Sequence, residues 1–339
     1  MIDFWTGYYK EIMNVSTAIN SSADEGTVDV SDQESLIQSI VFLLIGPLVI
    51  AANSVILWAI KNYKSLHKVT YYLLADLAVS DILCGVVSIL RFLAYFSDSK
   101  KLCVFSIFLT GLAYLGTLSG TLTISLHSCL AIKGHTRFLN GISVRVVKII
   151  ITVKWIVGII ISLATFVNGP GSNHEKDSCS IFGGYYTHGF LIVLATTCWT
   201  TVAAVIFTQA FTVIYVQCKK RALRSQAPQG NPSTANHLKK LKERSKVVTM
   251  ITIIVVLNTV ALLPVSIVGM LHIFCESCGI SQGHVALSAV SCLLSLFGNI
   301  VVYFLKSREF KKVLRAMCNR HGVVQAAIAQ PDIALVEIR

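Results

Sequence analysis

Two carboxylates stand in one apolar segment of this sequence. Asp76 and Asp81 fall within residues 69–93, where most side chains are apolar. Burying an acid in lipid costs roughly 2.5–3.5 kcal/mol on insertion scales, so a functional role is the default hypothesis for Asp81. Five residues along a helix turn the second acid about 140° away from the first. The two acids therefore face different neighbours, which excludes the paired-acid centre of an intramembrane protease. We predict instead that Asp76 bonds to a neighbouring helix, with Trp155 as the expected partner.

The elements that position these acids are long apolar runs. The chain is 54% hydrophobic and 14% charged, whereas a soluble domain is usually about 45–50% apolar and about 25% charged. Seven runs are long enough for a helix to cross the roughly 30 Å hydrocarbon core of a bilayer, and in lipid they must be helical. We therefore predict an all-α membrane protein, a bundle of seven transmembrane helices. The runs lie near residues 36–60, 69–93, 104–132, 146–167, 187–216, 246–272 and 283–305.

Lys and Arg are distributed unequally about these runs, and cytoplasmic loops carry an excess of basic residues. Most of the 29 basic residues follow runs one, three, five and seven, whereas the tail before run one is acidic. This pattern predicts an extracellular tail over 1–35, a bundle over 36–305 and a cytoplasmic tail over 306–339, in a multi-pass protein of the plasma membrane. Because the positive charge is confined to these loops, it does not indicate nucleic acid binding, and the lipid bilayer is the expected surrounding partner.

The N-terminal segment has features of an extracellular tail. It contains no basic region followed by an apolar run, so we expect no cleavable signal peptide. Asn14 and Asn20 each begin an N-x-S sequon, which predicts glycosylation at an exposed site. Chance occurrence in a tail rich in Ser and Asn is the alternative for either sequon.

Four cysteines fall on the predicted extracellular side. Cys103 begins run three and Cys179 lies in the polar segment NHEKDSCSIFGG. Cys275 and Cys278 form the C-x-x-C of CESCG, between runs six and seven. Disulfides form in that oxidising compartment, so we predict the pairs Cys103–Cys179 and Cys275–Cys278. Metal binding by the C-x-x-C is the alternative, and no second ligand pair stands near it in the sequence.

Landmark residues occur in a fixed order along these runs. They are Asn53 in AANSVILWAI, Asp81 in LAVSDILCG, Cys103 at the start of run three, Trp155 in run four, Tyr215 at the end of run five, Pro264 in NTVALLPV, and Asn299 and Tyr303 in GNIVVYFL. This ordered set, over about residues 36–318, resembles the rhodopsin-like G-protein-coupled receptors. The resemblance implies a receptor in which an extracellular ligand shifts the helices, the inner end of run six swings outward about Pro264, and the inner face engages a heterotrimeric G protein. A static packing kink is the alternative role for this proline.

The inner end of run three departs from that family. His127-Ser128-Cys129 replaces its Asp-Arg-Tyr, and Arg244 stands where relatives carry an acid that can pair with the lost Arg. Neither partner of that contact is present, so we expect coupling to a G protein to be altered or weak. Four other residues depart from the family pattern. Phe207 and Ile300 stand where the family has Pro, Asn258 where it has Phe, and Leu262 where it has Trp. Phe207 and the outer cysteine pair resemble the melanocortin, cannabinoid and lysolipid branch.

The resemblance also implies roles for polar residues inside the bundle. It implies a sodium site, because hard oxygen ligands suit a hard cation. The residues of this site would be Asp81, Thr117, Ser295 and Asn299. A protonated Asp81 in a structural hydrogen-bond network is the alternative. Sodium would be an allosteric ligand, and no other cofactor is expected. The residues implied to face the G protein are Ser128, Tyr215, Arg244 and Tyr303.

The outer halves of the runs supply candidate contacts for an extracellular ligand. The candidates are Arg91, Thr110, Tyr114, His272 and His284. Thr110 stands where amine receptors carry an Asp, which disfavours a simple amine, and Leu293 stands where opsins carry the retinal Lys. Arg91 could meet an anionic group, or it could extend its charge to the membrane interface. For Tyr114 and the two histidines, ordinary packing is the alternative.

Two cytoplasmic segments carry further patterns. The basic segment KKRALRSQAPQGNPSTANHLKKLKER is interrupted by Pro, Gly and Ser, so we expect a flexible middle and ends that extend runs five and six. In SREFKKVLRAMCNR, apolar residues share one helical face, which predicts a short amphipathic helix on the membrane surface. That face comprises Phe310, Val313, Leu314 and Met317. Cys318 is a candidate for palmitoylation, and an unmodified thiol is the alternative.

The resemblance and its departures leave two functions in competition. The first is a receptor that signals through G proteins with altered coupling. The second is a seven-helix protein without such signalling, for example a decoy, a scaffold or a chaperone for other receptors, which the loss of Arg at Ser128 motivates. A transporter or an enzyme ranks last, because the sequence has no inverted repeat, no H-E-x-x-H motif and no facing pair of acids. We therefore predict that the protein is not an enzyme.

Overall fold

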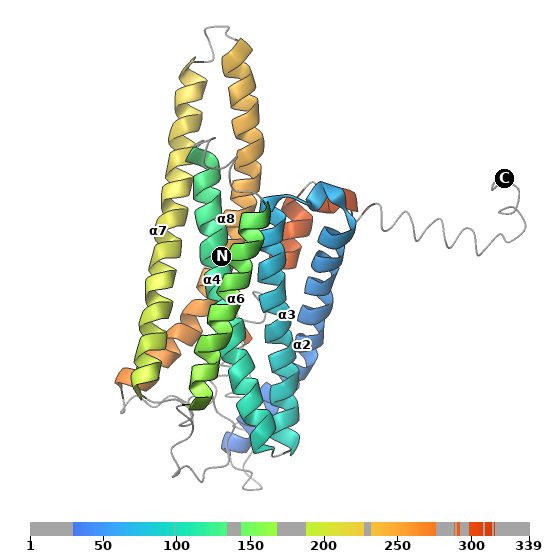
Figure 1. Ribbon diagram of the computed structural model, residues 1–339, viewed down its shortest axis with the longest axis vertical. Helices are drawn as coiled ribbons and strands as arrows, with labels where there is room; N and C mark the ends of the chain where they lie inside the picture. Colours follow the sequence, from blue (N-terminus) through green and yellow to red (C-terminus); the bar gives the residue numbers. More distant parts are fainter. Residues whose placement is uncertain are drawn as a thin grey trace, which may run out of the picture.

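The computed structural model describes residues 30–97, 99–133, 144–167, 188–226, 232–275, 288, 290–291, 298–307, 309–313 and 315. The helices run side by side as an elongated bundle (Figure 1). They are α2 (Val30–Asn62), the 3-10 turn η1 (Lys64–Leu66), α3 (Val69–Ser97), α4 (Lys100–Lys133), α6 (Val144–Val167), α7 (His188–Gln226) and α8 (Pro232–Phe274). Residues 298–306 and 309–313 are also helical.

Six helices in the described part of the chain are long and apolar enough to cross a membrane. Their apolar portions are Ser39–Asn62, Val69–Ala94, Lys101–Leu130, Val144–Leu163, Ala195–Ala222 and Ser245–Leu271. Each coincides with one of the first six predicted runs. Of the seventh run, 283–305, the structure describes residues 288, 290–291 and 298–305, all of them helical. The apolar runs therefore locate the membrane-crossing helices correctly.

Two helices continue far beyond their apolar runs. α7 has 39 residues and α8 has 43, which correspond to about 58 and 65 Å of helix, roughly twice the thickness of the hydrocarbon core. Figure 1 shows both helices extending past the ends of their neighbours. The basic segment between runs five and six is thus helical to Gln226 and again from Pro232. Lys, Leu, Glu and Arg in HLKKLKER favour a helix, and proline suits its first position.

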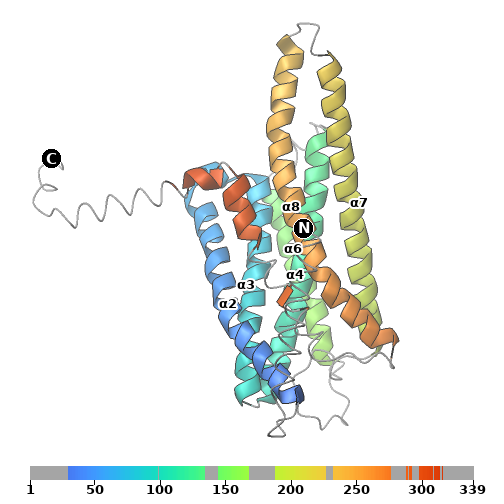
Figure 2. The ribbon, with the colours of Figure 1, turned by 180° about the vertical axis from the view of Figure 1, so that it is seen from behind.

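A proline interrupts α8 within its apolar portion. Pro264 cannot donate the backbone hydrogen bond of an interior helical residue and its ring crowds the preceding turn, so it bends the helix. Figure 2 shows α8 changing direction along its length. The helix therefore has two arms, one on each side of this residue.

The outward faces of α6 and α7 are apolar. Ile149 and Ile160 on α6, and Phe207 and Ile214 on α7, are each at least 60% exposed. A water-soluble protein rarely presents so much contiguous apolar surface. The lipid tails of a bilayer provide the surroundings that these side chains require.

Two glycines bring α2 and α3 into close contact. A Cβ atom added to Gly85 would lie 2.8 Å from the carbonyl oxygen of Gly46 and 2.7 Å from Ile50 Cγ1. A Cβ atom on Gly46 would in turn lie 2.9 Å from the carbonyl oxygen of Gly85. The two backbones can approach this closely because neither residue has a side chain, as is common between membrane helices.

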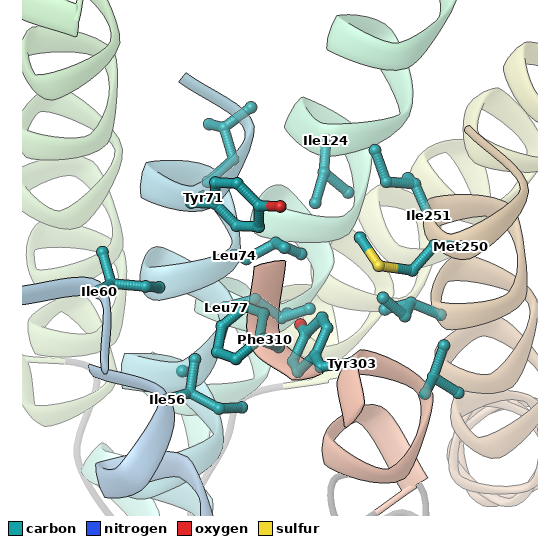
Figure 3. Packing of buried hydrophobic residues seen from close by; sticks show 14 of the residues in the cluster. Ile56, Ile60, Tyr71, Leu74, Leu77, Ile124, Met250, Ile251, Tyr303 and Phe310 are labelled. Carbon is teal, nitrogen blue, oxygen red and sulfur yellow. The ribbon is translucent and has the colours of Figure 1, made fainter. Parts of the chain in front are cut away.

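The largest buried apolar cluster lies toward the end of the bundle where Phe310 enters. Figure 3 shows Tyr71, Leu74, Tyr303 and Phe310 gathered around this point. The Phe310 ring is 5.8 Å from the ring of Tyr71 and 5.8 Å from that of Tyr303, centroid to centroid. The short helix over 309–313 is therefore anchored by an aromatic side chain inserted between α3 and the last membrane helix.

The predicted amphipathic face is confirmed for the residues that the structure describes. Phe310 and Val313 are buried, whereas Lys311, Lys312 and Arg315 are exposed. The side chain of Leu314, and Met317 and Cys318, lie outside the described residues.

Candidate functional site

Asp81 is bonded to Asn299 in the interior of the bundle. Asn299 donates from Nδ2 to Asp81 Oδ2 at 3.2 Å, and both residues are almost completely buried. Asn53, also buried, donates from Nδ2 to the carbonyl oxygen of Val49 at 3.1 Å. The first, second and seventh membrane helices thus bring three polar side chains into the interior of the bundle.

One side-chain oxygen of each of these buried residues has no hydrogen-bond partner among the described residues. They are Asp81 Oδ1, Asn53 Oδ1 and Asn299 Oδ1. Buried oxygens normally accept a hydrogen bond or bind a cation. Their chemistry fits a hard cation such as sodium, to which a carboxylate and amide oxygens are suitable ligands. It also fits a protonated Asp81.

The other implied members of the sodium site differ in what the structure describes. Thr117 is buried and donates from Oγ1 to the carbonyl oxygen of Ala113 at 3.0 Å, a bond within α4. Its hydroxyl oxygen retains a lone pair that can serve as a ligand. Ser295 lies outside the described residues.

The residues of the His127-Ser128-Cys129 motif make one contact within α4 and one with α3. Ser128 is buried and donates from Oγ to the carbonyl oxygen of Ile124 at 2.8 Å, in its own helix. His127 Nε2 lies 3.3 Å from Thr70 Oγ1 at the start of α3, and Cys129 has a free, half-buried thiol. The backbone of Arg244 belongs to α8, but its side chain lies outside the described residues.

Two tyrosines implied to face a G protein occupy different surroundings. Tyr215 on α7 is half-buried, stacks on Phe211 with ring centroids 6.1 Å apart, and has Lys219 Nζ 5.6 Å from its ring. Tyr303 is fully buried against Phe310. Tyr303 is therefore a core residue in this arrangement, whereas Tyr215 lies partly at the surface.

A polar contact joins three helices of the bundle. The Tyr114 hydroxyl of α4 lies 2.7 Å from Cys198 Sγ of α7 and 3.3 Å from Ser266 Oγ of α8. Cys198 Sγ lies 3.2 Å from the same Ser266 oxygen. Leu262 packs in the apolar cluster beside this group. The sequence identified Tyr114 but missed Cys198 and Ser266, because small polar residues are frequent in these helices.

The structure describes the side chains of two of the remaining candidate ligand contacts, Thr110 and Arg91. Thr110 Oγ1 donates to the carbonyl oxygen of Ser106 at 2.7 Å, within α4. Arg91 is partly exposed near the end of α3. The side chain of His272, and the whole of His284, lie outside the described residues.

Asp76 binds two adjacent residues of α6. Trp155 donates from Nε1 to Asp76 Oδ1 at 2.8 Å, which confirms the predicted partner. Lys154 donates from Nζ to Asp76 Oδ2 at 2.5 Å. The sequence prediction missed this ion pair, because neighbouring positions on a helix usually point to different sides. Here the long Lys154 side chain reaches back to the carboxylate.

Comparison with known proteins places this arrangement in a family. Residues 52–303 match the family described as 7 transmembrane receptor (rhodopsin family). The chain belongs to the rhodopsin family of seven-transmembrane receptors. It is therefore a multi-pass membrane protein of a family of signalling receptors and not an enzyme, as the sequence predicted.

Several known proteins are similar to this receptor over most of its length. Sphingosine 1-phosphate receptor 1 of Danio rerio is 27% identical over 301 residues, which is 85% of this chain and 79% of the relative. Adenosine receptor A2a of Cavia porcellus is 22% identical and lysophosphatidic acid receptor 1-B of Xenopus laevis 26% identical; they cover 82% and 78% of this chain and 72% of each relative. The crystal structure of squid rhodopsin superimposes with a TM-score of 0.70 over 84% of this chain and 85% of that one, at 14% identity. That likeness shows the fold.

The receptor's predicted extracellular features are described only in part. Cys103 and Cys275 are both disulfide-bonded. Their predicted partners, Cys179 and Cys278, lie outside the described residues, as do Asn14 and Asn20. The two pairings and the two glycosylation sites therefore stay predictions.

Proposed function

We propose that this receptor lies in the plasma membrane and carries a signal from an extracellular ligand to a heterotrimeric G protein. In this proposal the tail 1–35 is extracellular, 36–305 forms the bundle, and 306–339 is cytoplasmic. Ligand binding displaces the cytoplasmic arm of α8 about Pro264. The proline inside α8 and the basic ends of α7 and α8 support this direction of signalling.

We propose further that coupling is altered at the inner end of α4. The observation that carries this proposal is the bond from Ser128 Oγ to Ile124 within the same helix at 2.8 Å. A short side chain bonded to its own backbone cannot reach a neighbouring helix or a G protein as a guanidinium could. Tyr215 and Arg244 would contribute to the cytoplasmic face, and Tyr303 would support it from the core.

The ligand site proposed for this receptor lies among the outer ends of α3, α4, α7 and α8. Tyr114 supports it, because its hydroxyl contacts both Cys198 and Ser266 and would respond to movement of either helix. Arg91, Thr110, His272 and His284 are the other proposed contacts. Because two similar receptors are named for sphingosine 1-phosphate and lysophosphatidic acid, lysolipids form the first panel to screen, and adenosine the second.

The remaining proposals concern an ion and covalent features. A sodium ion bound by Asp81, Asn299, Thr117 and Ser295 would act as an allosteric ligand, and the unpartnered oxygens of Asp81 and Asn299 support this role. The proposed disulfides are Cys103–Cys179 and Cys275–Cys278, the proposed glycans are on Asn14 and Asn20, and the proposed palmitoyl group is on Cys318.

The function is tested by second-messenger output in transfected cells. Wild type, Ser128→Arg and Ser128→Ala are compared at equal surface levels, both without ligand and with the ligand panels. We expect measurable output from wild type, a several-fold increase in Ser128→Arg, and an unchanged level in Ser128→Ala. If none of the three ever dissociates a G protein while present at the surface, the chain is a decoy, scaffold or chaperone instead.

A further inference from the structure

One buried amide joins three helices on the cytoplasmic side of the bundle. Gln209 of α7 donates from Nε2 to Ser125 Oγ of α4 at 3.0 Å. Its Oε1 accepts a hydrogen bond from Thr252 Oγ1 of α8 at 3.1 Å. Gln209 is 6% exposed and Ser125 is fully buried. We call these three residues the Gln209 bridge.

The surroundings of the Gln209 bridge make its hydrogen bonds specific. Val205, Ile124, Ile251 and Val255, from the same three helices, are all buried apolar residues. If either hydrogen bond broke without replacement, a polar group would remain unsatisfied in an apolar interior. The bridge therefore favours one relative position of α4, α7 and α8 over nearby alternatives.

The bridge lies on the arm of α8 that can move relative to Pro264. Thr252 precedes Pro264 by twelve residues, or about 18 Å along the helix. A pivot at Pro264 leaves the outer arm near Tyr114 and carries Thr252 away from α4. Such a movement breaks the Gln209–Thr252 bond if α8 moves alone, and the Gln209–Ser125 bond if α7 moves with it.

Two other polar contacts at this end do not connect α4 to the mobile arm. Ser128 donates to the backbone of its own helix, α4. Lys220 Nζ donates to Ser245 Oγ at 2.5 Å, which joins α7 to α8. Gln209, in contrast, supplies a polar route from α8 through α7 to α4 on the cytoplasmic side of Pro264.

We infer that the Gln209 bridge holds the cytoplasmic arm of α8 against α4 and restrains the receptor's basal activity. The bridge takes the place of the contact between an Arg and an acid in relatives, because those two positions hold Ser128 and Arg244 in this chain. This inference rests on the proposed signalling function for its physiological meaning. The structural restraint itself is independent of G-protein coupling and is measured separately.

The test measures the distance between α4 and α8 in the full chain in lipid nanodiscs. Spin labels are placed at Leu126→Cys and Val247→Cys, both exposed positions, in a chain whose six cysteines outside the two proposed disulfides are replaced by Ser. These are Cys84, Cys129, Cys198, Cys218, Cys292 and Cys318. Distances are compared in the wild-type bridge, Gln209→Leu, Thr252→Val and Ser125→Ala. Thr208→Val is the matched control, because Thr208 is adjacent to Gln209 and donates to Ala204 and Val205 of its own helix.

We expect Gln209→Leu to increase the population at longer distance by roughly three- to tenfold, the change that loss of one buried interhelical hydrogen bond produces. Thr252→Val should do the same if α8 moves alone, and Ser125→Ala if α7 moves with it. Thr208→Val should match wild type. If Gln209→Leu does not fold, the two smaller substitutions decide the question.

Unchanged distances in every folded bridge variant would overturn the inference. Basal second-messenger output is measured in parallel in cells. A longer distance together with raised output supports both the restraint and the signalling function. A longer distance with no output in any variant supports the restraint and contradicts the signalling function.

Discussion

Lys154 of α6 forms an ion pair with Asp76 of α3 at 2.5 Å, inside the membrane-crossing portions of both helices. The side chains are 11% and 1% exposed. Trp155 supplies a second donor to the same carboxylate. The pair therefore places a formal positive and a formal negative charge in a region from which water and counterions are largely excluded. The effect on stability of substituting either residue is therefore expected to depend strongly on whether the other is present.

Substituting Lys154 alone should destabilise the bundle. Lys154→Met leaves the Asp76 carboxylate bonded to Trp155 but without its positively charged partner, and breaking a buried pair in this way costs about 3–5 kcal/mol. We expect a markedly lower melting temperature in nanodiscs and reduced surface expression.

The matched control for that variant is the double substitution Asp76→Asn with Lys154→Met. It removes both charges and keeps an acceptor for Trp155, so its stability should return to within about 1 kcal/mol of wild type. A double variant that is no more stable than Lys154→Met would show that the charges do not depend on each other.

Gly85→Ala should separate α2 from α3. The added Cβ would lie 2.8 Å from the Gly46 carbonyl oxygen, and a backbone atom cannot rotate away as a side chain can. Overpacking of this kind costs about 1–3 kcal/mol. Gly158→Ala is the control, because its Cβ would be 3.4 Å from Leu112 Cδ1, an ordinary contact. Equal melting temperatures for the two variants would contradict the prediction.

Phe310→Ala should release the short helix over 309–313. The ring is buried against Tyr71, Tyr303 and Phe304, and removal of a buried Phe side chain costs about 3–5 kcal/mol. We expect faster hydrogen–deuterium exchange of the amides in 309–313, with little change in α3. Lys312→Ala, at an exposed position, should leave the exchange rates unaltered.

The ion pair between Lys68 and Glu309 should stabilise the docked short helix much less than Phe310 does, and its contribution should depend on pH. Partial burial acts to raise the pKa of Glu309, but its hydrogen bonds to its own backbone and to Tyr71, together with Lys68 at 3.4 Å, outweigh burial and lower that pKa below the ordinary 4.5. The ionised form is thus favoured when the helix is docked, so its contribution is present above pH 4.5 and is lost as the pH falls through the lowered pKa.

The size of that contribution follows from exposure. Lys68 is 62% and Glu309 34% exposed, and solvent screening limits such pairs to less than about 1 kcal/mol. Glu309→Gln should therefore speed exchange over 309–313 slightly at neutral pH, and the difference from wild type should vanish well below pH 4.5. A difference that persists in acid would point to packing and not to charge.

Asp81→Asn should abolish any stabilisation by sodium. If the ion binds at the unpartnered oxygens of Asp81 and Asn299, the wild-type melting temperature should rise as sodium chloride replaces choline chloride at constant ionic strength. The neutral amide of the variant removes the charged ligand, so its melting temperature should not respond. A wild-type protein that is insensitive to sodium would favour the protonated acid.

The fold was largely predictable because lipid imposes a simple requirement. A segment such as 69–93 must be apolar and helical to cross the bilayer, so the membrane-crossing portions follow from composition. The extension of α8 beyond its apolar portion was expected, but its start as far back as Pro232 was not, because a polar helix is stabilised by local propensity and carries no apolar run. The burial of Phe310 was predictable from helical spacing, but its insertion between Tyr71 and Tyr303 was not.

The sequence identified some of the polar residues in the interior of the bundle, but it did not show which of them contact one another. Asp76 and Asp81 were identified because acids are rare in membrane segments, and Trp155 was a correct partner for the first. Gln209, Cys198 and Ser266 passed unnoticed, since neutral polar residues occur commonly in such helices without special roles. Which of them meet depends on the rotation and tilt of three separate helices, and a single sequence contains no direct information on those angles.

The length of α8 gives the bend at Pro264 a mechanical meaning. Between Pro264 and Pro232 the arm is about 48 Å long, so a turn of only about 10° at the proline would sweep its far tip through about 8 Å. An adjustment too slight to disturb side-chain packing near the pivot would thus be magnified into a displacement large enough for another protein to sense. Deleting whole helical turns from the arm would reduce the displacement of its tip and would leave the bend at Pro264 unchanged.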